Sequence, residues 1–150
     1  MAEPEQICLM SKVNGQLVKD GQPLPNTRLV RELSYVYKDG FHTDEAITNA
    51  EGYFSFPAIF EKKKRFAFLN MFSIGQVIKA PAHGENAQIW IGSKTEPEEN
   101  SEARGKAINV FCDLENEFTT TRIENSSYHL RCAWDVESDP EPDYGLSEDY

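Results

Sequence analysis

Long hydrophobic runs are missing from this sequence, and their absence limits where the protein can act. No stretch of about 18 consecutive apolar residues occurs, which excludes a helix that crosses a membrane. The start, Met1-Ala2-Glu3-Pro4-Glu5-Gln6, has no basic segment and no apolar segment, so it does not read as a secretory signal. We therefore expect a cytoplasmic protein without membrane insertion, or a periplasmic one if a signal was removed from this chain.

Familiar catalytic and metal-binding motifs are also missing. The chain has no Gly-x-Ser-x-Gly elbow, no P-loop, no His-Glu-x-x-His and no Cys-x-x-Cys. His42 stands near Asp44 and Glu45, which could form a metal or acid–base site, but a histidine in a surface turn is the favoured interpretation. An enzyme with an unrecognised site around His42 or His83 is kept as an alternative. We expect a non-enzymatic protein that holds no metal and no cofactor.

Basic residues are absent from the end of the chain, so much of the net negative charge is concentrated there. The net charge is −10, and from Asp135 onward seven residues are acidic and none is basic. We therefore divide the chain into a body, residues 1–134, and an acidic flexible tail, residues 135–150. Phosphate binding needs a basic stripe, so no nucleic-acid partner is expected. An acidic tail can instead steer a basic protein partner.

Cysteine is rare, with Cys8, Cys112 and Cys132 as its occurrences. An odd number of cysteines without a secretory signal favours free, mostly buried thiols. If a disulfide does form, the pair we expect is Cys112–Cys132. Each of these residues falls in a late strand, and neighbouring strands could bring them to bridging distance.

Alternating polar and apolar residues predict β-strands along most of the chain. The turn signals between them include Asp20-Gly21 and Asn49-Ala50-Glu51-Gly52. The expected strands cover Ile7–Val18, Thr27–Tyr37, His42–Thr48, Gly52–Phe60, Ala87–Ile91, Lys106–Leu114, Thr119–Ile123 and Tyr128–Trp134. Arg65–Lys79 is expected as one or two strands with a break near Asn70 or Gly75, with a short helix over Leu69–Ile74 as the alternative. Many short strands at such intervals predict an all-β sandwich.

Three motifs of the first half resemble the carboxypeptidase-regulatory-like, transthyretin-like domains. They are the strand Gly15-x-Leu17, the turn Gly21-Gln22-Pro23-Leu24-Pro25, and the hairpin from Thr48 through Gly52 to Phe56. The likeness covers roughly residues 7–60. It implies an antiparallel transthyretin-like sandwich, and it says little about function because that fold hosts many functions.

A second likeness extends over most of the chain. Four segments resemble a family of small bacterial proteins: Ile7-Cys8-Leu9 with Lys12-Val13 and Gly15, the strand with Val30-Arg31, the strand Phe111-Cys112-Asp113-Leu114, and the closing Cys132-x-Trp134. Members are often encoded near type VI secretion toxin loci. The resemblance implies an immunity protein that binds and neutralises a secreted antibacterial toxin. The alternative is a ligand-binding, carbohydrate-binding or structural accessory module of a secretion system, for example one with a pocket lined by Trp90 or Trp134.

The candidate binding residues fall into two groups. Aromatic residues near turns could anchor a protein partner, or could pack in the core and its rim. These are Tyr35, Tyr37 and Phe41, with Tyr53 as a further member. The acidic residues Asp139, Glu141 and Asp143 of the tail could steer the partner. Calcium binding by these three is disfavoured, because the glycine-pinned loop of such a site is missing.

Overall fold

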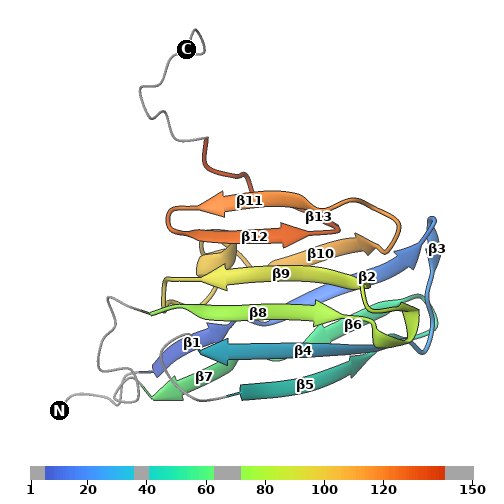
Figure 1. The fold of residues 1–150 in the computed structure, drawn as a ribbon, viewed down its shortest axis with the longest axis horizontal. Coiled ribbons are helices and arrows are strands. Elements are labelled where there is room, and N and C mark those ends of the chain that lie inside the picture. Colours follow the sequence, from blue (N-terminus) through green and yellow to red (C-terminus); the bar gives the residue numbers. More distant parts are fainter. Residues whose placement is uncertain (1–5, 36–40, 63–71, 141–150) are drawn as a thin grey trace, which may run out of the picture.

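Two twisted sheets face each other in an all-β architecture (Figure 1). The structure is a computed structural model and describes residues 6–35, 41–62 and 72–140. The front layer of Figure 1 is a six-stranded antiparallel sheet. Its strands, in spatial order, are β11 (Thr119–Ile123), β12 (Ser126–Leu130), β9 (Gln88–Lys94), β8 (Ile74–Lys79), β4 (Arg28–Tyr35) and β5 (Phe41–Ile47).

The second sheet lies behind the first and is built around one central strand. Its strands are β13 (Cys132–Trp134), β10 (Ile108–Asp113), β2 (Val13–Lys19), β3 (Gln22–Pro23) and β6 (Tyr53–Phe56). Central β2 pairs with β6 along one side and with β10 along the other. The β2–β10 ladder is parallel, which corrects the expectation of an antiparallel fold throughout. Alternation specifies which face is buried, but not the direction of a partner strand some 90 residues away.

A two-stranded ribbon continues the β2–β6 ladder. It consists of β1 (Gln6–Met10) and β7 (Ile59–Lys62). The pairs Met10↔Ile59 and Val13↔Phe56 keep one register on both sides of the interruption. The strands expected over Ile7–Val18 and Gly52–Phe60 are therefore each split in two. Pro57 explains the second break, because it has no N–H for the ladder. Ser11 explains the first, because its N–H donates to the Glu102 carboxylate instead.

The expected last strand, Tyr128–Trp134, is also two strands, and they belong to different sheets. The chain crosses between the layers at Arg131, whose guanidinium donates to the backbone carbonyls of Gln88, Asn116 and Asn86. The alternating pattern does not reveal this crossing, because it continues through it: Tyr128 and Leu130 before it and Cys132 after it are all buried. Gly75, one of the two positions considered for a break, lies inside β8 and pairs with Ser34 and Ser93. Asn70 lies outside the described residues, as does the first half of the helix alternative over Leu69–Ile74, and Ile74 at its end begins β8.

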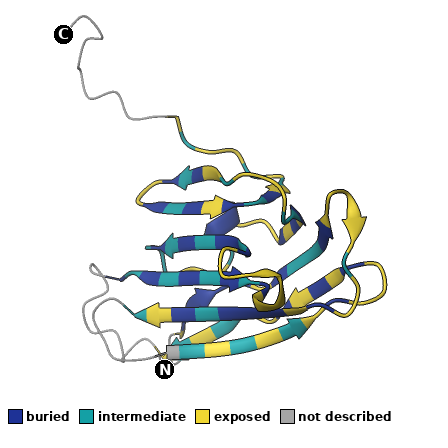
Figure 2. Cartoon of the chain, turned by 45° about the vertical axis from the view of Figure 1, so that its right-hand side comes forward, coloured by how far each residue is buried: buried dark blue, intermediate teal, exposed yellow. Residues whose placement is uncertain are grey.

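Burial alternates along most strands, as Figure 2 shows. One hydrophobic cluster fills the molecule, and its largest fully buried apolar side chains are Leu9, Met10, Leu17, Leu29, Leu33, Phe56, Ile74, Ile78, Trp90 and Tyr128. Each such side chain contributes about 1.5–3 kcal/mol by leaving water. Three charged side chains are buried as well: Arg31, Lys94 and Glu102. The Arg31 guanidinium is bidentate to Asp44 and lies 4.9 Å from the centre of the Phe56 ring.

Candidate functional site

The outer face of the second sheet carries two rows of side chains that run across its strands. The backbone register places Tyr53 of β6, Gln16 of β2, Phe111 of β10 and Ala133 of β13 side by side in the first row. The second row consists of Ser55, Asn14 and Asn109. Side chains two residues apart on a strand share a face, so both rows point away from the core. The face is therefore built from amides, hydroxyls and two aromatic rings.

A shallow groove of about 520 Å³ opens on this face. Its lining residues are Asn14, Gly15, Gln16, Tyr53, Phe54, Asn109, Val110, Phe111 and Ala133, and none of them is charged. Tyr53 and Phe111 are 52% and 46% exposed, which is unusual for rings of this size. Exposed aromatic side chains beside a hollow are typical of a surface that binds something.

Gly15 lines the groove and contributes only backbone atoms to it. A Cβ at this position would lie 2.5 Å from Cζ of Phe54 and 2.7 Å from Cγ2 of Val110. The rings and branches that fill the core below the groove therefore require a residue without a side chain here. The groove is fixed by the packing of the sheet and does not depend on a loop.

A smaller hollow of about 260 Å³ adjoins the groove at Asn109. It is lined by Lys106, Ala107, Asn109, Trp134, Asp135 and Val136. Trp134 is half-buried here, while Trp90 is buried in the core and donates from Nε1 to Gln76. Of the two tryptophans proposed as pocket residues, Trp134 therefore lines a hollow and Trp90 does not.

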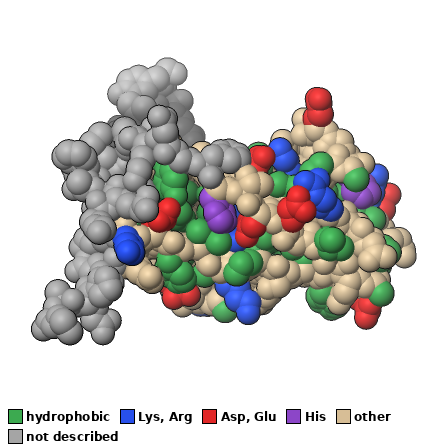
Figure 3. All heavy atoms as spheres, turned by 90° about the horizontal axis from the view of Figure 1, so that it is seen from below, with side chains coloured by type: hydrophobic (Ala, Val, Ile, Leu, Met, Phe, Trp, Pro, Cys, Tyr) green, Lys and Arg blue, Asp and Glu red, His purple; other side chains and the backbone are tan. Residues whose placement is uncertain are grey.

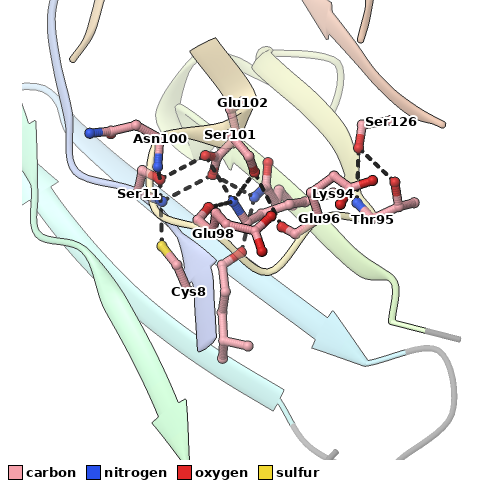
Figure 4. Close-up of polar contacts among 12 residues, drawn as sticks. Cys8, Ser11, Lys94, Thr95, Glu96, Glu98, Asn100, Ser101, Glu102 and Ser126 are labelled. Atoms are coloured by element: carbon pink, nitrogen blue, oxygen red, sulfur yellow. Dashed lines mark hydrogen bonds and ion pairs between the residues drawn. The ribbon is translucent and has the colours of Figure 1, made fainter. Parts of the chain in front are cut away.

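A second cluster of polar groups lies inside the molecule, where the connection from β9 to β10 folds over β1 (Figure 4). The ammonium of Lys94 and the carboxylate of Glu102 are 3.0 Å apart, and both side chains are fully buried. Lys94 also donates to the carbonyl of Glu98 and to the hydroxyl of Ser101. All three hydrogens of the ammonium group thus have acceptors.

The Glu102 carboxylate is satisfied as completely as its partner. It accepts hydrogen bonds from the N–H and the hydroxyl of Ser11, at 3.0 and 2.7 Å, and from Nε2 of Gln76 at 3.2 Å. Removing one member of such a pair leaves an uncompensated buried charge. These contacts therefore fasten the β9–β10 connection to the sandwich. They hold the 3₁₀ turn η4 (Ser101–Ala103) against the end of β1.

The cysteines differ from what we expected. Cys112 and Cys132 face each other across the β10–β13 ladder and form a disulfide, so the preference for three free thiols was wrong. The pair itself is the one expected if a bridge existed. Cys8 is free and buried. Burial raises the pKa of the Cys8 thiol, although the nearby Ser11 hydroxyl acts in the opposite direction, so this thiol is a poor nucleophile.

The comparisons with known proteins give one match. The model of a family described as a domain of unknown function, DUF6795, matches residues 13–117. The chain belongs to the DUF6795 family. The comparisons with curated proteins and with solved structures found no match. The DUF6795 region includes β2, β6 and β10, with both groove aromatics, and it includes both members of the Lys94–Glu102 pair.

The candidate binding residues from the sequence are scattered over the DUF6795 region and beyond it. Tyr35 is half-buried and its hydroxyl donates to Glu61. Tyr37 and the side chain of Phe41 lie outside the described residues, as do Glu141 and Asp143. Asp139 is described, and it is engaged within the chain. Arg104 binds its carboxylate, and the N–H of Glu124 donates to it at 2.7 Å.

Asp139 belongs to a segment that lies along the free edge of β11. Its own N–H donates to the carbonyl of Arg122, and the N–H of Arg122 donates to the hydroxyl of Ser138. The hydrogen bond from Arg104 lowers the pKa of the Asp139 carboxyl below its usual value. Residues 135–139, the start of the expected tail, are therefore attached to the sandwich and cover an otherwise open strand.

The histidines give no assembled site in the part of the chain that the structure describes. His42 lies on β5 between the layers, near Asp44, which binds Arg31, while Glu45 binds Arg28. His83 is exposed in the 3₁₀ turn η3 (Pro81–His83), and His129 is exposed on β12. No group of three or more potential metal ligands gathers among the described residues. No described helix is long and apolar enough to cross a membrane.

Sequence reasoning missed most of the groove. Tyr53 was among the candidate aromatics, but Phe111 and the three amides were not. The signal for Phe111 was present, because the alternation of Lys106–Leu114 places Asn109 and Phe111 on the face opposite Cys112. What the sequence could not show is that β2 and β6 lie beside that strand. The Lys94–Glu102 pair gave no signal, since Glu102 falls in a polar, acidic stretch typical of a solvated loop.

Proposed function

We propose that the protein is a non-catalytic binding module that holds its partner on the outer face of the β13–β10–β2–β6 sheet. The observation that carries the proposal is the pair of exposed rings, Tyr53 and Phe111, on either side of a groove of about 520 Å³. Exposed aromatics in a hollow are the side chains that contribute most to binding energy. Their positions follow from strand register, so the site is rigid before the partner arrives.

The partner expected from the family resemblance is a secreted antibacterial toxin, which makes the protein an immunity protein. In this form of the proposal the two rings are the anchors of the toxin interface. The tail has a smaller part than the sequence suggested, because Asp139 is already paired with Arg104. Steering of a basic toxin then depends on the acidic residues beyond it.

Co-expression with each member of a panel of type VI secretion toxins tests this role. We expect the wild-type protein to restore growth, and the Tyr53→Ala/Phe111→Ala double variant to lose protection. Phe60→Ala is the matched control, because Phe60 is 41% exposed but does not line the groove. If the wild-type protein neither protects growth nor co-elutes with any of these toxins, the immunity role is rejected.

The fold and the compartment form part of the same proposal. Two facing sheets support a transthyretin-like topology, which a comparison of an experimental structure of the chain with known transthyretin-like domains would test. The Cys112–Cys132 disulfide supports the periplasm over the cytoplasm, because structural disulfides persist in oxidising compartments. Alkylation of thiols in intact cells, followed by mass spectrometry, distinguishes the two compartments.

A further inference from the structure

The side-chain amides of Asn14, Gln16 and Asn109 in the groove have donor or acceptor atoms that form no hydrogen bond among the described residues. Oδ1 of Asn14 accepts from Ser55, and Nε2 of Gln16 donates to the carbonyl of Glu51. No hydrogen bond of the described residues uses Nδ2 of Asn14, Oε1 of Gln16 or any side-chain atom of Asn109. The groove therefore offers both donors and acceptors in one small area. A ligand that suits it must itself both donate and accept.

The two rings are held at a fixed separation. Tyr53 on β6 and Phe111 on β10 both pair with Gln16 of the intervening β2. Two strand spacings put their Cα atoms about 9–10 Å apart. Gln16 lies between the two aromatic residues in the same row, so a ligand that contacts both of them also covers an amide.

Other ligand classes fit the groove less well. No lining residue is charged, so an anionic or cationic ligand would lose its hydration without gaining a partner. The nearest acid on this face of β10, Asp113, already accepts from the N–H groups of Asp20, Gly21 and Glu115. A peptide that adds a strand needs the open backbone groups of a sheet edge, whereas the middle of the groove lies over β2, which is paired on both of its edges.

We propose that the groove binds a neutral saccharide, with Tyr53 and Phe111 stacked against sugar rings and the amides of Asn14, Gln16 and Asn109 bonded to hydroxyl groups. A pyranose ring has an apolar C–H face and hydroxyls that donate and accept, which are the two properties this surface demands. The inference rests on the proposed binding face and names the ligand class. A protein partner at the same face is the competing outcome.

The test is calorimetric titration of the whole chain with neutral oligosaccharides: α-1,4- and β-1,4-linked glucose, β-1,3-linked glucose, and β-1,4-linked N-acetylglucosamine. We expect at least one to bind, with a Kd that changes less than twofold between 50 and 500 mM salt, since no ion pair forms. Tyr53→Ala and Phe111→Ala should each weaken binding at least tenfold. Phe60→Ala should leave it unchanged. Thermal unfolding verifies that the variants remain folded.

Three results would overturn the saccharide assignment. The first is that none of these sugars binds at 10 mM. The second is that both ring variants bind the sugar as well as the wild-type protein does. The third is that binding is lost as the salt concentration rises. A failure of the saccharide assignment can be distinguished from a failure of the proposed binding face. If the sugars fail but the ring variants abolish toxin binding, the face stands and its ligand is a protein. If the ring variants alter neither, both proposals fall.

Discussion

The buried pair Lys94–Glu102 carries the sharpest stability prediction. Glu102→Gln leaves the Lys94 ammonium buried without its counter-charge, so we expect a loss of roughly 3–5 kcal/mol of unfolding free energy. Urea denaturation followed by tryptophan fluorescence measures it. Glu98→Gln is the control, because Glu98 contacts Lys94 through its backbone carbonyl and its side chain is exposed. A Glu102→Gln variant as stable as this control would refute the fastening role.

The cysteines give a second prediction about single side chains. The disulfide closes a loop with a sequence separation of 20 residues, so the Cys112→Ala/Cys132→Ala variant should lose about 3 kcal/mol. Reduction of the wild-type protein should lower its melting temperature, and should not lower that of the variant. Cys8, which is buried, should react with alkylating reagents only when the protein unfolds. Equal melting temperatures with and without reductant would show that the bridge does not stabilise the fold.

The segment along β11 has a pH-dependent attachment. The folded-state pKa of Asp139 is lowered by Arg104, so its contribution to attachment is present above the unfolded value of 3.8. It is lost as the pH falls through the lower folded value. An NMR titration of the Asp139 and Glu124 amide protons should show a shared midpoint below 3.8. The Asp139→Asn variant should show no such transition. A midpoint at or above 3.8 would mean that Arg104 does not hold the carboxylate.

The strands differ in how far the sequence could predict them. The alternation of Lys106–Leu114 predicts a strand with Ile108, Val110 and Cys112 on one face, and these residues are buried on β10. Such local alternation is enough to choose a buried face. The splits of the chain at Ser11 and Arg131 could not be foreseen. Each depends on a hydrogen bond to a residue that is remote in the sequence, and a local pattern contains no information about such a partner.

The candidate binding face could also be predicted only in part from the sequence. The outward positions of β10 could be read from the sequence, but their neighbours could not. Asn109 and Phe111 line a groove only because β2 and β6 supply Asn14, Gln16 and Tyr53 beside them. A parallel ladder between distant strands brings them together, and nothing in either strand specifies it.

The molecule as a whole separates its charge from its candidate binding face. Acidic and basic side chains are interspersed over the side seen in Figure 3. Ion pairs of the described residues include Arg28 with Glu45 and Lys79 with Glu32. The groove on the second sheet is uncharged. For a neutral saccharide held there we expect recognition by stacking and hydrogen bonds, so its binding should depend little on ionic strength.

The location of the binding face can be measured whether the partner is a sugar or a protein. Backbone amide NMR spectra of the ¹⁵N-labelled chain are recorded during titration with each oligosaccharide and with each member of a panel of type VI secretion toxins. The account predicts that the first partner to bind shifts the amides of residues 14–16, 53–55 and 109–111. It predicts no comparable shifts on β8, β9 and β12. Shifts confined to the six-stranded sheet, or to the edge strand β5, would contradict it.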